Sequence, residues 1–466
     1  STDSFKTQTI SDDTAADAMP DNPDTALPDQ VSAAIPDDAT VVSEDHAVTA
    51  DGELKNITTG ETVTDPALVG TQDSQPDPLA KTDGESFIPV QADEVKQKVA
   101  ANGGDTNAGA VDTGEAADST TATNGAAKAT TKGSVRLAAL QNNEYGAHWG
   151  SYNGTAAFFD ASNNLFVQQA KGVIDVSAWQ GNINWQAVKN SGVEGAIIRI
   201  GYGWGNGFDK QALRNISECR RLGIPFGIYL YSYAYDANTG AAEGSSLVNL
   251  LQKAGVSSSD LGYPVYYDLE RWTWTGHEVP NDPGMYDGIV NAWYGRLQSA
   301  GYNNLAVYSY TSYLNTALNS GNIHSKTRWV AQYGSSMGYT AFPTNDRGWQ
   351  YTSNGSVSGI SGTVDLNAFG NQTATSSAPS VPVYRVYNPN DGNHLFTMNS
   401  YERDNLARLG WHDEGVSWYV PSGGSINVYR LYNPNNGEHV FTTEYGEYVL
   451  VGRAGWHQEG VAWTSL

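Results

Sequence analysis

The chain has 466 residues, one cysteine and a formal net charge of −24 at pH 7. This length exceeds what one hydrophobic core usually organises, so we expect more than one domain. The single cysteine, Cys219, excludes an internal disulfide framework, and the sequence has no run of about 18 apolar residues that could span a membrane. Cys219 lies in a helical pattern and is expected to be a buried apolar residue rather than a nucleophile.

The first part of the chain is strongly acidic. Residues 1–130 carry 25 acidic and six basic side chains and only two aromatic ones, Phe5 and Phe87. Such a segment buries too little apolar surface to offset the entropy lost on ordering. We therefore predict a disordered acidic spacer over residues 1–133, with an acidic arm that binds a basic partner as the alternative. Residues 134–170 contain several aromatic residues and are predicted to be a lead-in segment that packs on the next domain.

Short apolar runs alternate with helical patterns between residues 171 and 370. The predicted strands are 172–176, 195–200, 226–231, 265–269, 305–308, 328–331, 348–351 and 363–366. The predicted helices are 185–190, 210–222, 241–253 and 286–299. Eight strands in alternation with helices indicate the α/β class and a closed, TIM-like β/α barrel, which is irregular because the later helices are short or missing.

Two carboxylates, Asp268 and Glu270, stand two residues apart at the end of an apolar, aromatic strand. Alternate side chains of a strand share a face, so both acids would point into the same space. Crowding and partial burial separate the pKa values of two such acids, which is what cleavage of a glycosidic bond needs. The alternative is a pair of solvated loop charges. Asp175 and Asp365 are predicted to end the first and last strands, at the same mouth of the barrel.

Aromatic and amide side chains gather at the same strand ends, as in a site that binds sugars through ring faces and hydroxyl groups. By alternation, Tyr229, Tyr266 and Trp329 are expected to point the other way and to fill the core. The candidate substrate-binding residues are Trp179, Tyr231, Tyr233, Tyr267, Trp272, Gln332, Tyr333, Trp349 and Gln350.

Seven separated motifs in this region resemble the lysozymes of glycoside hydrolase family 25. They are Gly172-Val-Ile-Asp-Val-Ser-Ala-Trp-Gln-Gly181, Ile197-Ile-Arg199, Gly227-Ile-Tyr229, Tyr267-Asp-Leu-Glu270, Trp329-Val-Ala-Gln-Tyr333, Trp349-Gln-Tyr351 and Val364-Asp-Leu-Asn367. The resemblance implies a flattened β/α barrel that hydrolyses the β-1,4 bond between N-acetylmuramic acid and N-acetylglucosamine in bacterial peptidoglycan. It also implies that Glu270 is the general acid and that Asp268, Asp175 and Asp365 are supporting carboxylates.

The spacing of the acid pair favours net retention of configuration, because strand residues two apart have Cα atoms about 6.5 Å apart. Asp268 is then either the nucleophile or the base that orients the 2-acetamido group of the sugar, and the sequence does not separate these roles. The alternative from another functional class is a non-catalytic lectin or adhesin on the same barrel. A chitinase-like barrel fits less well, because Asp175-Val-Ser-Ala-Trp-Gln-Gly181 does not resemble the opening of that family.

No cofactor or metal is expected. The histidines of the barrel, His277 and His324, stand alone and show no metal-binding spacing. The glycine-rich stretch 201–207 lacks the Gly-Lys-Ser/Thr ending of a phosphate-binding loop and is interpreted as a flexible rim of the cleft.

The last part of the chain contains an internal repeat with an offset of 45 residues. Tyr384-Arg-Val-Tyr-Asn-Pro-Asn-Asp-Gly-Asn-His394 recurs from Tyr429 to His439, and a Gly-Trp-His motif also recurs. We predict a linker over residues 371–381 and a small two-repeat α+β domain over residues 382–466. The domain is predicted to bind cell wall or carbohydrate through faces that include His394, Trp411 and Trp418 and their counterparts His439, Trp456 and Trp463, unless these side chains merely pack each small core.

These features together predict a secreted protein, extracellular or associated with the cell wall, whose partner is peptidoglycan. We expect a monomer with no nucleic-acid partner and no membrane span. The chain starts at Ser1 without a basic, apolar leader, as would a secreted protein whose signal has been removed or a trimmed chain.

Overall fold

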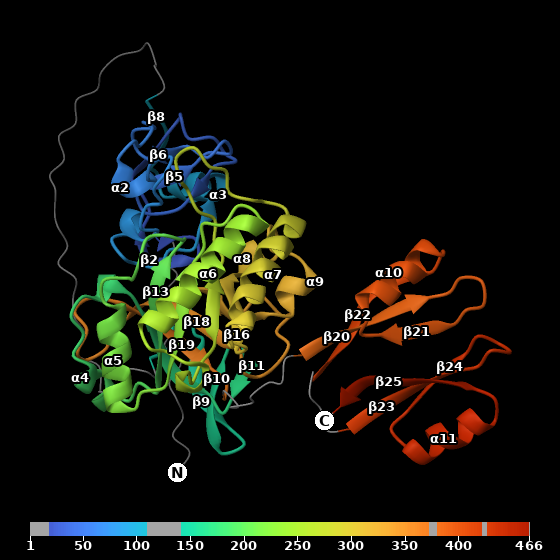
Figure 1. The fold of residues 1–466 in the computed structure, drawn as a ribbon. Helices are drawn as coiled ribbons and strands as arrows, with labels where there is room; N and C mark the ends of the chain where they lie inside the picture. Colours follow the sequence, from blue (N-terminus) through green and yellow to red (C-terminus); the bar gives the residue numbers. More distant parts are fainter. Residues whose placement is uncertain (1–17, 110–140, 372–379, 422–425, 466) are drawn as a thin grey trace, which may run out of the picture. The chain divides into compact units, whose positions relative to one another are not determined.

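A computed structural model describes residues 18–109, 141–371, 380–421 and 426–465. The chain divides into two compact units, Ser1–Thr373 and Ala374–Leu466. The first unit contains an N-terminal domain, a small antiparallel sheet and a barrel, and the second contains two similar sheets, each with one helix (Figure 1).

The centre of the first unit is a closed barrel of eight strands. The strands are β12 (Lys171–Val176), β13 (Gly195–Tyr202), β14 (Phe226–Tyr231), β15 (Val265–Asp268), β16 (Leu305–Tyr310), β17 (Thr327–Ala331), β18 (Gly348–Gly355) and β19 (Val364–Phe369). The predicted α/β class and all eight predicted strands are confirmed. One feature is absent from the prediction: β19 runs antiparallel to both of its neighbours, β18 and β12, whereas every other neighbouring pair is parallel.

Helices accompany the strands of the first half and the middle of the barrel. They are α4 (Trp185–Asn190), α5 (Ala212–Leu222), α6 (Ala237–Lys253) and α7 (Pro283–Ser299), followed by the single turns α8 (Thr311–Leu314) and α9 (Gly321–His324) and accompanied by the 3₁₀ turns η3 (Ala178–Gln180) and η4 (Ser258–Asp260). Aspartates fix two of the starts, because the Asp236 and Asp282 side chains accept backbone N–H groups in the first turns of α6 and α7. Helices α6 and α7 approach closely at Gly240, where a Cβ atom would lie 2.6 Å from the carbonyl oxygen of Ile289.

A three-stranded antiparallel sheet precedes the barrel and packs on its outside. Its strands are β9 (His148–Tyr152), β10 (Thr155–Phe159) and β11 (Leu165–Gln168). The ring of Phe158 lies 5.3 Å from Trp349 and 4.6 Å from Tyr351, measured between centroids, so the sheet and β18 share one apolar core.

We expect Phe158→Ala to lower the free energy of unfolding of this unit by about 3–5 kcal/mol, because it leaves a cavity among buried aromatic rings. The matched control is Tyr152→Ala in the same sheet, where the side chain is 41% exposed. That substitution should change the free energy of unfolding by no more than about 0.5 kcal/mol. Urea unfolding followed by tryptophan fluorescence measures both. Equal effects of the two substitutions would contradict the shared core.

The predicted disorder of residues 1–133 is wrong for residues 18–109, which form a folded domain. Its elements are β1 (Ala18–Met19), β2 (Asn22–Ala26), β3 (Gln30–Ser32), β4 (Thr40–Val41), β5 (His46–Val48), β6 (Leu54–Asn56), α2 (Pro66–Val69), η1 (Ala80–Thr82), β7 (Val90–Gln91), α3 (Ala92–Ala101) and β8 (Asp105–Ala108). Small aliphatic side chains, among them Val31, Ile35, Val41 and Val95, are fully buried in its own core. The average composition does not reveal this core, because its few apolar residues are spread along a segment that is rich in acidic residues. Residues 1–17 and 110–133 lie outside the described residues.

The second unit repeats one small motif of three antiparallel strands and a helix. The first copy contains β20 (Ser380–Tyr387), β21 (His394–Thr397), α10 (Ser400–Arg408) and β22 (His412–Pro421). The second contains β23 (Ile426–Tyr432), β24 (His439–Thr442), α11 (Tyr445–Arg453) and β25 (His457–Ser465). Strand order is the same in both copies, and their inner side chains, including Val383, Val428 and Trp463, form one core.

Candidate active site

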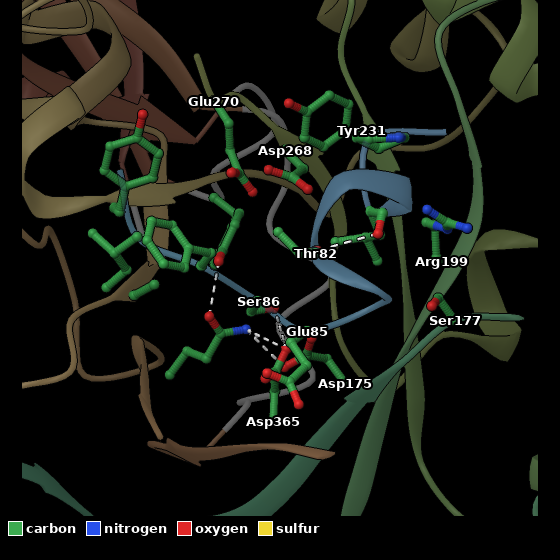
Figure 2. Close-up of a pocket in the computed structure, with 18 of the residues that line it drawn as sticks. Thr82, Glu85, Ser86, Asp175, Ser177, Arg199, Tyr231, Asp268, Glu270 and Asp365 are labelled. Atoms are coloured by element: carbon green, nitrogen blue, oxygen red, sulfur yellow. Dashed lines mark hydrogen bonds between the residues drawn. The ribbon is translucent and has the colours of Figure 1, made fainter. Parts of the chain in front are cut away.

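Four carboxylates from three strand ends meet at one mouth of the barrel. Asp268 ends β15 and Glu270 follows it, while Asp175 is the penultimate residue of β12. Asp365 was predicted at the end of the last strand. It lies instead near the start of β19, and because that strand is antiparallel, its start pairs with the end of β12, with Asp365 directly opposite Asp175. All four side chains line one cavity (Figure 2).

Gln350 holds two of these acids in place. Its Nε2 donates a hydrogen bond to Oδ2 of Asp175 at 2.9 Å and a longer one to Oδ2 of Asp365 at 3.4 Å. Its Oε1 accepts hydrogen bonds from the hydroxyl groups of Tyr308 and Tyr333, both at 2.9 Å. Since both ends of the amide are engaged, its orientation is fixed by these partners.

Burial raises the pKa of each of the four barrel acids, Asp175, Asp268, Glu270 and Asp365. The pKa of Asp268 is raised well above its usual value, first by desolvation and then by the charge of Glu270, to which it is hydrogen-bonded. Desolvation raises the pKa of Glu270 to about 7, whereas the hydrogen bond from Asp268 and the charge of Lys81 lower it. Desolvation is also the largest cause of the raised pKa of Asp175 and Asp365. The pair Asp268 and Glu270 therefore holds a proton at neutral pH, as a proton-donating site requires.

Comparison with known proteins identifies the family. The model of the glycosyl hydrolases family 25 matches residues 174–360. Lysozyme M1 of Streptomyces globisporus is 30% identical over 214 residues, which are 43% of this chain and 68% of that protein. This chain belongs to glycosyl hydrolases family 25. Its barrel is accordingly a glycoside hydrolase domain of the lysozyme type.

Other similarities are partial. The autolytic lysozyme of Clostridium acetobutylicum is 26% identical over 200 residues, covering 42% of this chain and 55% of that protein. The solved structure of the modular autolysin LytC from Streptococcus pneumoniae, in complex with a synthetic peptidoglycan ligand, is 34% identical, with 47% of this chain and 52% of that chain covered and a TM-score of 0.44. This chain thus spans about half the length of that autolysin. Residues 340–466 match a domain of unknown function, DUF5648.

The family 25 barrel brings only some of the candidate sugar-binding residues to the cavity. Tyr231, Tyr333 and Gln350 line it. Trp179 lies in η3 and is 39% exposed, with its indole N–H directed to Asp77 of the N-terminal domain at 3.4 Å. These positions are compatible with contact to a sugar.

The assignment is wrong for Tyr267 and Trp349, which point out of the barrel. Each is the immediate neighbour of an inward residue, so strand alternation directs it to the outer face. Tyr267 stacks on Trp293 of α7 at 4.4 Å, and Trp349 packs against the small antiparallel sheet.

Three further candidates also lie away from the cavity. Tyr233 and Trp272 belong to an aromatic cluster with Trp274 that adjoins the cavity through Tyr231 but does not line it. Gln332 is bound instead by the hydroxyl of Thr311 and the backbone N–H of Gly338. All three stand in the loops that follow strands, where alternation no longer predicts direction.

The opposite error concerns Tyr229 and Trp329, which were expected to point away. Both line the cavity, because they are two residues from Tyr231 and Ala331 on the same strands and therefore share their face. The barrel interior also presents Arg199, which the site assignment missed. A charged residue inside the apolar strand Gly195–Tyr202 was the signal for it, since such a group is buried only with a partner.

The N-terminal domain supplies one wall of the same cavity. Ten of its residues, between Pro78 and Pro89, line it together with Val42. We call residues 77–89 the cover segment. Figure 2 shows Thr82, Glu85 and Ser86 of this segment among the labelled carboxylates of the barrel.

No part of the described chain resembles a metal centre. The ranges that the structure describes contain no group of three or more histidine, cysteine, aspartate or glutamate side chains that could hold a metal ion. The described helices are also too short or too polar to cross a membrane.

Proposed function

We propose that this protein hydrolyses bacterial peptidoglycan at the β-1,4 bond between N-acetylmuramic acid and N-acetylglucosamine, with net retention. The observation that carries the proposal is that Asp268, which is buried, and Glu270, which is half-buried, lie together in the cavity of a family 25 barrel and that the pKa of each is raised. Glu270 donates its proton to the leaving oxygen as the bond breaks, and then removes a proton from the attacking water. Desolvation raises the pKa of both acids, that of Glu270 to about 7, so the coupled pair holds a proton near neutrality that Glu270 can pass to the leaving oxygen.

The remaining acids stabilise the positive charge that develops on the sugar. Asp175 accepts hydrogen bonds from Gln350 and from the Nδ2 of Asn367 at 2.8 Å, which fix its position. Asp365 lies opposite it in the strand pairing. A preorganised carboxylate of this kind lowers the barrier without moving during the reaction.

The reducing ends that cleavage creates in the glycan chains show which bond is cut. Purified peptidoglycan is incubated with the protein, and the products are reduced with borohydride and identified by mass spectrometry. Reduced muramic acid ends support the proposal, whereas reduced glucosamine ends identify a glucosaminidase instead. Binding without any new ends favours the alternative function, a wall-binding lectin.

Asp268 acts, in this proposal, by orienting the 2-acetamido group whose carbonyl oxygen attacks the anomeric carbon. We expect a soluble substrate with an N-trifluoroacetyl group on the cleaved muramic residue to react at least about a hundredfold more slowly, because its carbonyl oxygen is a poorer nucleophile. The kcat/KM of the two substrates measures this. An unchanged rate, together with a glycosyl adduct on Asp268 detected by mass spectrometry, would instead identify Asp268 as the nucleophile.

We further propose that the C-terminal unit binds the wall and that the protein acts outside the cell or on the wall. Each copy presents a group of rings, in which Tyr387 contacts His394 and His412, and Tyr432 contacts His439 and His457. Trp418 is 37% exposed, whereas its counterpart Trp463 is buried in the shared core. The wall-binding face predicted from sequence therefore includes Trp418 but not Trp463.

Removal of residues 376–466 should reduce co-sedimentation with insoluble wall and lysis of intact wall several-fold. Cleavage of short soluble glycans should remain nearly unchanged, because a second binding unit acts by raising the local concentration on a polymer. Residues 171–370 carry 14 acidic and 13 basic side chains and residues 371–466 carry nine and five, so neither part is cationic and binding should not weaken with added salt. Sedimentation at low and high salt measures both effects. Equal sedimentation of the shortened and parent chains would contradict the wall-binding role.

A further inference from the structure

The cover segment fills the cleft in which the glycan would lie. The cavity left between the segment and the carboxylates has a volume of about 60 Å³. Binding sites for small molecules have volumes of about 300–1,000 Å³. The space that remains is far smaller than this, so a sugar ring does not fit in the site while the segment is in place.

Strong polar contacts hold the segment there. The carboxylate of Asp77 receives two hydrogen bonds from the guanidinium of Arg199, at 2.8 and 2.9 Å. Arg199 is itself buried and also donates from Nε to Asp209 at 2.8 Å. Next to Asp77, the carbonyl oxygen of Pro76 accepts a hydrogen bond from the hydroxyl of Tyr233 at 2.9 Å. Bidentate, charge-assisted bonds of this type are among the strongest and most directional in proteins.

The segment also satisfies groups that a sugar would otherwise contact. The hydroxyl of Ser86 donates a hydrogen bond to Oδ2 of Asp365 at 2.6 Å, as a sugar hydroxyl could. Gly84 lies against the exposed indole of Trp179, where a Cβ atom would be only 2.4 Å from that side chain. The positive charge of Lys81 lowers the pKa of Glu270 and so favours the ionised carboxylate, which cannot donate a proton.

A second set of contacts joins the domain to the barrel beside the cleft. The indole N–H of Trp274 donates to the carbonyl oxygen of Thr71 at 2.6 Å, and a ring nitrogen of His277 lies 2.9 Å from the carbonyl oxygen of Gln72. The backbone N–H of Thr275 donates to the carbonyl oxygen of Val69 at 2.8 Å, and its hydroxyl donates to the same oxygen at 3.0 Å. The domain therefore touches the barrel both inside the cleft and at its rim.

We propose that the N-terminal domain is an intramolecular inhibitor whose cover segment occupies the glycan site and must leave it before hydrolysis. This inference rests on the proposed function of the cleft. Only open molecules bind glycan in this model. The apparent affinity for glycan is therefore the intrinsic affinity multiplied by the fraction of molecules that are open. The competing model is a fixed domain that forms a permanent wall of the working site.

A reversible crosslink separates the two models. The Cβ atom that a side chain at position 276 would have lies 3.9 Å from Cβ of Gln72, within the range of about 3.5–4.5 Å found in disulfides. Cys219 is buried, so the double variant Gln72→Cys/Gly276→Cys offers one accessible pair of thiols. We expect its oxidised form to cleave insoluble peptidoglycan at least about tenfold more slowly than its reduced form, because the domain cannot leave the rim.

Control variants separate the effect of the crosslink on activity from the effects of the two substitutions. Gly276 has a φ of 79°, so Gly276→Cys alone measures any effect of backbone strain, and Gln72→Cys alone measures the effect of the other substitution. Mass spectrometry verifies the disulfide, and dithiothreitol should restore activity to the level of the reduced variant. Equal activity of the oxidised and reduced forms would overturn the inference.

A second variant weakens the closed state without a crosslink. Asp77→Asn removes the charge that Arg199 binds and should raise activity several-fold. Asp83→Asn is the matched control, because this exposed residue of the same segment has a backbone conformation, φ 50°, that asparagine tolerates. A loss of activity in Asp77→Asn would favour the permanent wall and contradict an inhibitory role.

A measurement of glycan binding tests the inhibitory segment separately from the proposed hydrolysis. Soluble peptidoglycan fragments, added to the oxidised and reduced forms of the crosslinked variant, should bind only the reduced form, as measured by tryptophan fluorescence. If no form of the protein releases new ends from peptidoglycan, the proposed hydrolysis fails, but this difference in binding still supports the inhibitory segment. Equal binding to both forms would refute it.

Discussion

Replacing Glu270 by glutamine should lower turnover of peptidoglycan by about three orders of magnitude or more. The substitution removes the proton that the leaving oxygen needs and changes the side-chain volume little. Folding and binding of soluble glycan fragments should therefore remain close to those of the parent. Release of reducing ends measures turnover, and titration with fragments measures binding.

The matched control is Glu278→Gln, which removes a carboxylate from an exposed position beyond the same strand. This variant should retain the activity of the parent. Both substitutions are best repeated in the Asp77→Asn background, in which opening of the cleft limits the rate less. Activity of Glu270→Gln within about tenfold of the parent would rule out Glu270 as the general acid.

Replacing Asp268 by asparagine should lower turnover but raise the free energy of unfolding. Turnover should fall by about a hundredfold or more, because an amide can neither attack the sugar nor orient its acetamido group as a base. The free energy of unfolding at pH 7 should rise, because desolvation keeps Asp268 protonated in the folded parent at a pH at which the unfolded chain releases this proton, and asparagine has no proton to release.

The pH dependence identifies the cause of the added stability. Asp268 has a usual pKa of 3.8 and a raised pKa in the folded protein. As pH rises above 3.8, the unfolded chain releases this proton before the folded one does, so the parent loses stability until the folded pKa is passed. The advantage of Asp268→Asn should therefore be absent below about pH 4 and grow towards neutrality. Urea unfolding at both pH values measures it, and an equal gain at both would point to packing instead of charge.

The barrel could be predicted from sequence because its signals are local. Each strand is a short run of buried apolar residues, and aspartates mark the starts of the long helices. The direction of β19 could not be predicted in this way, since the strand pattern is the same in parallel and antiparallel pairing. It depends on which neighbours close the barrel, which is a long-range property.

The acids of the site were placed by the same reasoning, but the aromatic residues were not. Strand alternation was applied inconsistently: Tyr229 was placed on the face opposite to Tyr231, although they stand two residues apart, and Tyr267 was assigned to the cleft although it adjoins the inward Asp268. The N-terminal domain was missed for a different reason. Its aliphatic core consists of short segments between acidic turns, and part of its surface is buried only against the barrel, which composition cannot reveal.

The order of the elements along the chain also determines the order in which the domains are synthesised and fold. The N-terminal domain is synthesised first, and domains generally fold in that order as the chain emerges. The barrel cannot close until β19 has been made, and the same strand delivers Asp365 to the site. The inhibitor is therefore present before its target exists, and a chain interrupted anywhere before β19 has neither a closed barrel nor a full set of acids. Synthesis in this direction yields an enzyme that is restrained from the moment it becomes complete.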